Sequence, residues 1–355
     1  MSASPATKPR IALWDNARFG AIALVVAGHA LTKMVGENDA AFTLYVFIYA
    51  FHVPVFVAVS GYFTKATAPD DRRIRGLFTD VLLPYVIFES IWTLLYWALS
   101  GKLNADFTHA SWTLWFLLAL AMWRVILPYL AMLRYPLIIS IVVSIGAGYF
   151  AIDQTFSLAR ALGLLPFFIF GWKLRQWNIG ERWMAFSAAA VRWWRAGAIL
   201  LLVVVGVVLG TNVTLWRDLD IRRFLTYDAG YATFGYDQWW AGALRLAFML
   251  IAAAMIMAFL ILIPRRRTWF TQFGQATMYV YLLHTFVLYP LRENGFLDGE
   301  RPLWFLLLVL VGALGLTVAL STPIIRRTFR PLIEPNVPWF FSRPLRSVTA
   351  YYTLH

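Results

Sequence analysis

Long apolar stretches separated by short polar segments dominate the chain. A helix that crosses the hydrocarbon core of a membrane needs about 20 mostly apolar residues. On that basis the pattern predicts ten membrane-spanning helices, of which the fifth and sixth are short. They cover residues 12–34, 42–63, 77–99, 111–130, 136–152, 158–174, 196–214, 238–263, 272–291 and 302–323. The predicted fold class is all-α, a polytopic membrane protein with one helical bundle at 1–330 and a short cytoplasmic tail at 331–355.

The basic residues of the polar segments indicate the orientation of the bundle. With the N-terminus in the cytoplasm, the inner segments hold twenty Lys and Arg residues and the outer segments six. Cytoplasmic loops carry such an excess, so both termini are predicted to be cytoplasmic. The net charge of +13 then reflects contact with anionic membrane lipids, and no nucleic acid is expected as a partner.

Composition narrows the chemistry. Apolar residues make up 61% of the chain and charged residues 14%, which excludes an ordinary soluble globule. The absence of cysteine excludes disulfides, thiolate nucleophiles and cysteine metal sites. The five histidines are scattered, so no metal-binding cluster is predicted.

Three ionisable residues lie in the first predicted span, where each costs about 2.5–3.5 kcal/mol and is usually functional or turned inward. They are Asp15, Arg18 and His29. The eleven residues from Arg18 to His29 turn a helix through about 1100°, or about 20° past three full turns. Both side chains therefore share one face, about 16 Å apart along the axis. A functional pair fits this pattern, and so do an arginine extended to the interface and a histidine that bonds a neighbouring helix.

The second span contains His52 and Pro54, and it ends near Tyr62. Proline lacks an amide proton, so Pro54 should kink the helix and free a carbonyl that needs a partner or a cavity. His52 fits a substrate contact or a helix-packing role equally well.

A basic cluster follows the second span on the predicted cytoplasmic side. Such a cluster can simply set the topology. It can also clamp the phosphates of a donor such as coenzyme A, because guanidinium groups pair well with phosphate oxygens. The residues are Lys65, Arg72, Arg73 and Arg75.

Two further ionisable residues lie in the middle of spans: Glu89 in the third and His284 in the ninth. A carboxyl group at such a depth must be protonated or paired. The long outer segment at 211–237 mixes aromatic and acidic residues, which suits sugar binding and also suits an aromatic belt at the membrane surface.

The combination of these residues resembles the membrane-bound acyltransferase family 3, which includes bacterial envelope sugar O-acetylases. The resemblance covers about residues 11–290. Its motifs are Arg18 followed by ten residues and His29, then Phe51-His52-Val53-Pro54-Val55-Phe56, Ser60-Gly61-Tyr62-Phe63, Arg72 with Arg75, Leu83-Pro84-Tyr85, Trp115-Phe116-Leu117, Leu165-Pro166-Phe167-Phe168, Gly171, Gly274 and Tyr281-Leu282-Leu283-His284.

The resemblance implies a multi-pass enzyme of the bacterial inner membrane that uses acetyl-CoA, or another acyl-CoA, and no metal. The acceptor would be a hydroxyl of an envelope glycan or glycolipid. Some relatives carry an additional extracytoplasmic hydrolase-like domain that completes transfer. This chain is expected to have no room for one, so direct transfer by the membrane domain is expected. The implied catalytic residues are His29 and Arg18, and the donor-binding residues are Arg72, Arg75, Arg73 and Lys65. The implied substrate-binding residues are His52, Asp15, Tyr62, Glu89, His284 and Trp115.

In the expected mechanism, His29 removes the proton of the acceptor hydroxyl, which is typically worth about 10²–10⁴-fold in rate. Arg18 or a nearby dipole stabilises the developing charge. Two other functions stay open: a glycolipid transporter or flippase without acyl transfer, and a scaffold subunit of an envelope complex. Buried charges and a proline-kinked helix fit a transporter as well.

Overall fold

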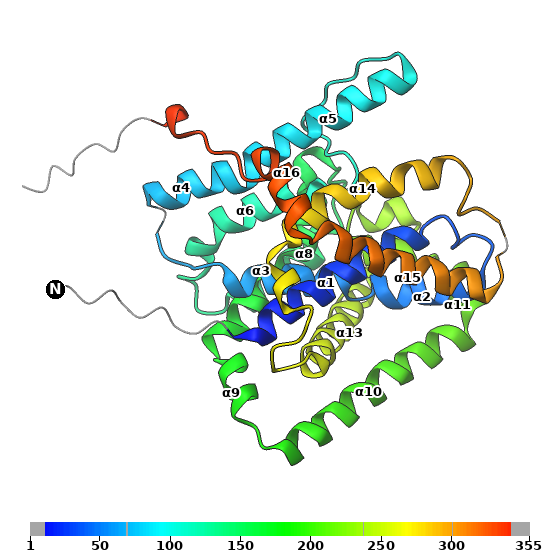
Figure 1. Ribbon diagram of the computed structural model, residues 1–355. Coiled ribbons are helices and arrows are strands. Elements are labelled where there is room, and N and C mark those ends of the chain that lie inside the picture. Colours follow the sequence, from blue (N-terminus) through cyan, green and yellow to red (C-terminus); the bar gives the residue numbers. More distant parts are fainter. Residues whose placement is uncertain (1–10, 69, 237, 300, 342–355) are drawn as a thin grey trace, which may run out of the picture.

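A computed structural model describes residues 11–341 except 69, 237 and 300 (Figure 1). The described residues form helices and helical turns, with no strand among them. The α-helices are α1 (Ala12–Leu31), α2 (Asp39–Tyr49), α3 (His52–Phe63), α4 (Asp71–Leu77), α5 (Leu83–Ser100), α6 (Trp115–Leu130), α7 (Pro136–Ala147), α8 (Leu158–Gln176), α9 (Ile179–Ala185), α10 (Ala188–Thr211), α11 (Val213–Asp218), α12 (Ile221–Thr226), α13 (Ala241–Leu262), α14 (Thr277–Glu293), α15 (Leu303–Leu320) and α16 (Pro323–Ile333). A π-helix, η1 (Phe78–Leu82), joins α4 to α5, and 3₁₀ turns occur at η2 (Thr155–Ser157), η3 (Tyr231–Phe234), η4 (Thr271–Gln275) and η5 (Pro338–Phe340).

The all-helical, membrane-spanning class is as predicted. Six helical segments of the described chain are long and apolar enough to cross a membrane: 39–63, 71–100, 155–176, 188–211, 241–262 and 303–320. All ten predicted spans overlap helices. The number of crossings beyond these six, and the side of the termini, stay predictions. The domain boundary expected after residue 330 falls inside α16, which ends at Ile333.

Segments predicted to share one side of the membrane lie together. On the predicted outer side, Arg217 of α11 pairs with Asp39 of α2 at 2.9 Å. On the predicted inner side, the Asn16 amide of α1 donates to the carbonyl of Pro264, after α13, at 2.9 Å. Alternating crossings of the chain require this kind of pairing.

The second predicted span consists of two helices with a break between them. Phe51, between α2 and α3, has φ −145° and ψ −13°, which no helix adopts. Pro54 lies in the first turn of α3, where a missing amide proton costs nothing. The break leaves His52 at the first position of α3, and its Nδ1 lies 3.0 Å from the carbonyl oxygen of Ile48. The predicted kink is thus a complete break, located just before the proline.

Close backbone contact between α3 and α8 holds the centre of the bundle together. A Cβ atom added to Gly61 would lie 2.0 Å from the Phe168 carbonyl oxygen, and one added to Gly171 would lie 1.8 Å from that of Ala58. Only glycine permits this approach. α1 packs on α3, η4, α14 and α15, so it lies at the core of the fold.

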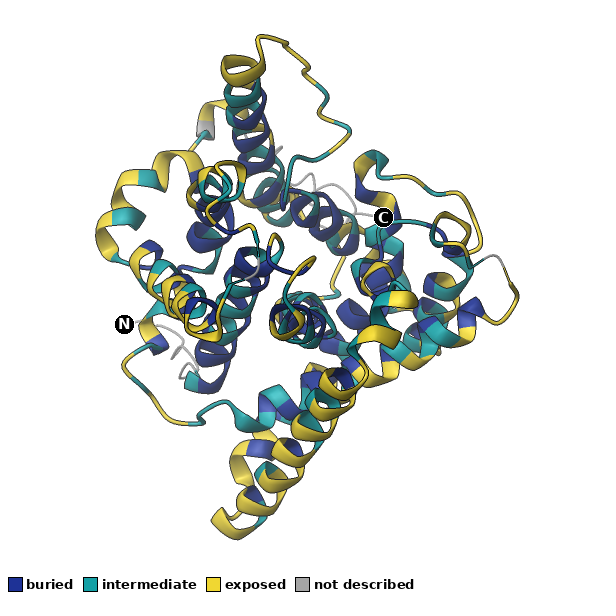
Figure 2. Ribbon diagram, turned by 90° about the vertical axis from the view of Figure 1, so that its right-hand side faces the viewer, coloured by how far each residue is buried: buried dark blue, intermediate teal, exposed yellow. Residues whose placement is uncertain are grey.

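The outer faces of the peripheral helices are apolar and exposed. α10 lies at the edge of the bundle, where it packs on α13 and α2 (Figure 1), and Figure 2 shows how exposed residues cover the periphery. Leu200, in the middle of α10, is 64% exposed. Such a surface requires an apolar solvent, which lipid supplies.

Candidate active site

Three histidines from three helices meet inside the bundle. His29 lies near the end of α1, His52 begins α3 and His284 lies in α14. His29 Nδ1 is 2.9 Å from His284 Nε2, and these two rings stack with centroids 5.2 Å apart. The His52 ring stands edge-on to His29, with centroids 6.4 Å apart. His52 and His284 are fully buried and His29 is half-buried, so His29 is the most accessible of the three.

Hydrogen bonds determine which nitrogen of each neutral ring carries the proton. His284 Nδ1 lies 2.9 Å from the Val280 carbonyl oxygen, which can only accept, so Nδ1 donates and Nε2 accepts. His29 Nδ1 therefore donates to His284 Nε2, which leaves the lone pair on His29 Nε2. By the same rule His52 Nδ1 donates to Ile48, and the buried His52 Nε2 has no hydrogen-bond partner among the described residues.

α1 and α3 run side by side in opposite directions, and this arrangement positions Arg18. His29 faces His52 at one end, and Arg18 faces Phe63 at the other, with the guanidinium carbon 3.9 Å from the ring centroid. Arg18 also pairs with Asp15 at 3.5 Å. Both Arg18 and His29 thus face α3, as their spacing predicts.

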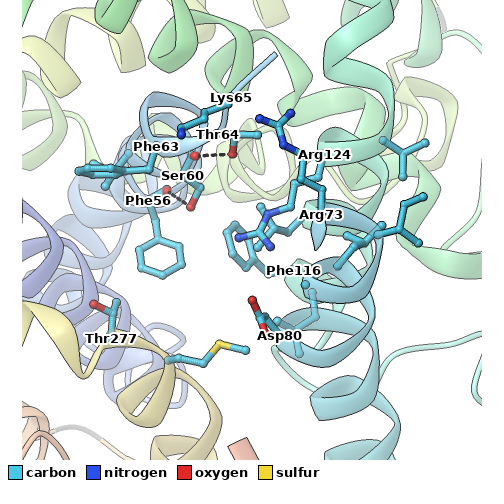
Figure 3. A pocket seen from close by; sticks show the side chains of 18 of the residues that line it. Phe56, Ser60, Phe63, Thr64, Lys65, Arg73, Asp80, Phe116, Arg124 and Thr277 are labelled. Atoms are coloured by element: carbon cyan, nitrogen blue, oxygen red, sulfur yellow. Dashed lines mark hydrogen bonds between the residues drawn. The ribbon is translucent and has the colours of Figure 1, made fainter. Parts of the chain in front are cut away.

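A cavity of about 1040 Å³ opens at the Arg18 end of α1, between α3, α4, η1, α6 and α14 (Figure 3). Lys65 and Arg124 lie in the upper part of the view, and Arg73 lies below Arg124. Five basic residues line this cavity against two acidic ones, so its charge is positive. They are Arg18, Lys65, Arg72, Arg73 and Arg124, with Asp70 and Asp80.

Tyr281 connects this cavity to the histidines. It lines the cavity, and its ring centroid lies 6.5 Å from that of His284. Phe56 and Phe116, which also line the cavity, lie 6.2 Å and 5.7 Å from Tyr281 by the same measure. Among the described lining residues His29 is absent, so one layer of aromatic side chains separates the cavity from the histidines.

A second cavity, of about 440 Å³, lies at the predicted outer side. Its lining includes Tyr45, Arg222 and Asp228. Tyr45 stacks on Tyr49 with centroids 3.8 Å apart, and Tyr49 contacts the His52 ring at 4.4 Å. A continuous row of rings therefore leads from this cavity to the histidines.

The wall of the second cavity is fixed by an ion pair. Arg160 of α8 bonds Asp228 at 3.1 Å, and its guanidinium carbon lies 5.0 Å from the Trp115 ring centroid. Trp115, predicted to bind substrate, therefore lies beside this wall. The predicted outer segment at 211–237, which suits either sugar binding or an aromatic belt, supplies Arg222 and Asp228.

Comparison with known proteins identifies the family. The model of an acyltransferase domain, that of acyltransferase family 3, matches residues 11–322. The chain belongs to acyltransferase family 3. Neither the curated proteins nor the solved structures gave a match. Family membership supports an acyltransferase activity in a membrane protein and confirms the resemblance.

The boundaries of the family match coincide with helix boundaries in the structure. The match begins at the start of α1 and stops at residue 322, directly before Pro323 opens α16. All three histidines and all five basic residues of the large cavity lie inside the matched range. α16 and the segment that follows it lie outside that range.

Eight of the twelve residues predicted for the site line neither cavity: the three histidines, Trp115, Glu89, and three residues with other contacts, Arg75, Asp15 and Tyr62. Arg75 lies against Phe341, with its guanidinium carbon 5.1 Å from the ring centroid. Asp15 is buried and pairs with Arg18. The Tyr62 ring packs on Trp14 with centroids 3.7 Å apart and planes 31° apart, and this contact holds α3 against α1.

The hydrogen bonds of Glu89 give it a structural role. Its two carboxyl oxygens accept from the Ser111 hydroxyl at 2.6 Å and from the Ser111 amide at 2.8 Å. These bonds attach the loop after α5 to the helix itself. The expectation that this carboxyl group needs a partner is met, and its contacts do not involve either cavity.

Two site residues were missed by the reading of the sequence. Arg124, in α6, lines the large cavity, and a lone arginine in the apolar stretch 115–130 is itself a signal of function. Tyr49 links Tyr45, in the lining of the second cavity, to His52. Nothing in its sequence context distinguishes Tyr49 from an ordinary membrane aromatic residue.

Proposed function

We propose that this acyltransferase moves an acetyl group, or another short acyl group, from cytoplasmic acyl-CoA to a hydroxyl of an envelope glycan or glycolipid. The observation that carries the proposal is the arrangement of His29. The hydrogen bond from His29 Nδ1 to His284 leaves the lone pair on His29 Nε2. The His29 ring lies between a basic cavity on the predicted inner side and a polar cavity on the predicted outer side.

The donor fits the large cavity. Coenzyme A carries several phosphate groups on a long, largely uncharged arm. Arg72, Arg73 and Arg124 offer guanidinium groups to the phosphates, and bidentate bonds of this kind are strong. Phe56 and Phe116 provide an apolar passage for the arm and its acyl group. A volume of about 1040 Å³ accommodates a ligand of this size.

The assignment of Arg18 changes with this placement. Arg18 lies in the wall of the donor cavity, about three helical turns from His29, so we assign it to donor binding. A charge that develops beside His29 must be stabilised by nearer groups.

The reaction needs one base. The acceptor hydroxyl oxygen attacks the thioester carbonyl carbon while His29 Nε2 takes the hydroxyl proton. The carbon–sulfur bond then breaks, and His29 returns the proton to the departing thiolate to give free coenzyme A. An unperturbed imidazole titrates near pH 6.5, so the neutral form that this step requires is available at neutral pH.

The acceptor fits the outer cavity. Asp228 accepts hydrogen bonds, Arg222 donates them, and Tyr45 presents a ring face. Sugar hydroxyl groups combine donor and acceptor roles, and their carbon faces pack on aromatic rings. We place the acceptor headgroup here and its reactive hydroxyl toward His29, in an enzyme of the bacterial inner membrane.

The test compares wild type with His29→Ala and with Arg124→Ala in envelope membranes supplied with radiolabelled acetyl-CoA. We expect His29→Ala to lower the turnover number by about 10²–10⁴-fold, because it removes the base. Arg124→Ala should mainly raise the KM for acetyl-CoA. Wild-type turnover by a correctly folded His29→Ala variant would contradict the mechanism.

A transport function makes a different prediction. It requires glycolipid movement without any acylated product. Mass spectrometry of envelope lipids and glycans from a deletion strain separates the two: loss of an acetyl-sized mass increment supports the enzyme. Unchanged acylation with altered glycolipid sidedness would favour a flippase.

A further inference from the structure

Helix α4 forms one wall of the donor cavity but has few anchors of its own. It places Arg72 and Arg73 in the cavity lining, and within the described part of the chain none of its residues is buried. Asp70 caps it by accepting from the Arg73 amide at 2.9 Å. α4 is the first two turns of the helical segment 71–100, which continues through the π-helix η1 into α5. Because none of its residues is buried, the direction in which α4 leaves η1 depends on contacts made around η1.

The end of the described chain supplies such contacts. The Phe340 ring stacks on Phe78, directly after α4, with centroids 4.8 Å apart and planes 12° apart. Phe341 meets Phe78 edge-on at 5.8 Å, and the Arg75 guanidinium carbon lies 5.1 Å from the Phe341 ring centroid. Figure 1 shows this red segment beside α4. We call Phe340 and Phe341 the C-terminal clamp.

The clamp lies at the end of a longer connection. α16, which precedes it, packs against α14 and α5. The Arg326 guanidinium carbon lies 6.0 Å from the ring centroid of Tyr279, in the same helix as His284. The C-terminal segment therefore joins the helix that orients His29 to the helix that lines the donor cavity. All of it follows residue 322, where the family match ends.

We propose that Phe340 and Phe341 are positioning residues for the donor: by holding Phe78 and Arg75, they keep α4 turned so that Arg72 and Arg73 face the cavity. This rests on the proposed function, because it assumes that the cavity binds acyl-CoA. Neither ring touches the reacting atoms. Loss of the clamp therefore weakens donor binding and leaves the chemical step at His29 intact.

The first experiment uses the cysteine-free chain as its background. A Phe78→Cys/Phe340→Cys variant replaces both stacked rings by thiols, and mild oxidation in membranes can tie the same two positions covalently. We expect a disulfide to form and to restore an acetyl-CoA KM that is raised in the reduced protein. Each single cysteine variant is the control. Equal KM values in both redox states, with the disulfide formed, would overturn the proposal.

The second experiment separates positioning from general stability. Phe340→Leu/Phe341→Leu keeps apolar side chains but removes ring stacking and the cation–π contact. We expect the KM for acetyl-CoA to rise roughly three- to tenfold, with the turnover number at saturating acetyl-CoA and the KM for the acceptor unchanged. Trp339→Leu, in the same segment and 79% exposed, should behave as wild type.

The outcomes are distinct. An unchanged KM in the double leucine variant, or a lower melting temperature with a reduced turnover number and no KM effect, overturns the clamp. Binding of acetyl-CoA to the purified wild-type protein serves as the reference. If wild type binds acetyl-CoA and the variants bind it equally well, only the clamp fails. If wild type does not bind it, the proposed function fails as well.

Discussion

His284 determines the tautomer of His29 in this structure, so replacing it tests the mechanism without touching the base. His284→Ala removes the acceptor that holds the His29 Nδ1 proton at 2.9 Å. The His29 ring can then rotate and carry its proton on either nitrogen. His284→Gln is the conservative partner, because its amide oxygen can accept near the position of Nε2. His109→Ala, in an exposed loop, is the matched control.

The expected loss follows from the strength of one hydrogen bond. A bond between neutral groups is worth about 0.5–1.5 kcal/mol net, which corresponds to roughly 2–13-fold in rate. Removal of the base itself is expected to cost about 10²–10⁴-fold. We therefore expect His284→Ala to lower the turnover number by about tenfold, clearly less than His29→Ala does. His284→Gln should recover most of that loss, and His109→Ala should have no effect.

The assay is acetyl transfer in membranes, measured over a range of acetyl-CoA concentrations. Because His284 orients a base and does not bind the donor, the loss should appear in the turnover number, with the KM for acetyl-CoA unchanged. Nitrogen-15 NMR of labelled histidine gives an independent measure. In wild type, His29 should show a protonated Nδ1 and an unprotonated Nε2. In His284→Ala this preference should be lost.

The double variant gives the decisive result. If His284 acts through His29, adding His284→Ala to His29→Ala costs nothing further, because the two residues act as a unit. Multiplying losses would mean that His284 contributes separately, and the tautomer argument would fail. The same conclusion follows if His284→Ala, correctly folded, retains full turnover.

Three further predictions concern the proposed donor cavity, the core and an exposed loop. Arg124→Ala should raise the KM for acetyl-CoA, and Arg124→Lys should recover part of the loss; equal KM values by steady-state kinetics would remove Arg124 from the donor site. Gly171→Ala should destabilise the fold by about 1–3 kcal/mol, because its Cβ would lie 1.8 Å from the Ala58 carbonyl oxygen; an unchanged melting temperature in detergent would contradict the close packing of α3 on α8. The Thr108 hydroxyl and amide, with His109, lower the pKa of the Asp106 carboxyl to about 2, from a usual value near 3.9. Because that pKa is lower in the folded state, the stabilisation is complete above about pH 4 and is lost as the pH falls through 2. The melting temperature of Asp106→Asn should therefore lie below wild type at pH 7, with a gap that narrows toward pH 2; a gap that stays constant with pH would refute it.

Helix periodicity was enough to predict the relation between Arg18 and His29. Both face α3, because a rigid helix converts an eleven-residue spacing into a shared face. Periodicity says nothing about partners on other helices. The His29–His284 bond joins residues 255 positions apart, and it depends on how α14 packs beside α1.

The basic loop shows the same limit on a smaller scale. Sequence grouped Arg72, Arg73 and Arg75 as one cluster, and only the first two line the cavity. Helix geometry alone would keep Arg75 with Arg72, because residues three positions apart are neighbours on the helix surface. Arg75 instead packs against Phe341, a partner far along the chain. A prediction from loop composition cannot assign side chains to faces when the loop itself contains a short helix. Arg124 could have been predicted from the sequence, because a lone charged residue in an apolar span usually has a function.

The antiparallel packing of α1 and α3 would let one bundle combine the proposed cytoplasmic donor with the proposed outer acceptor. The eleven residues from His29 back to Arg18 are matched by the eleven from His52 forward to Phe63, so both helices cover the same depth. One end of this pair meets the row of rings that leads from the outer cavity, and the other lines the basic cavity. The aromatic layer of Tyr281, Phe56 and Phe116 lies between the two compartments. In the proposed reaction only the acyl group has to cross that layer, since the phosphates stay with the arginines and the acceptor headgroup stays outside. A passage wide enough for a thioester arm, but closed by rings when empty, would let the enzyme transfer an acyl group while keeping the membrane sealed.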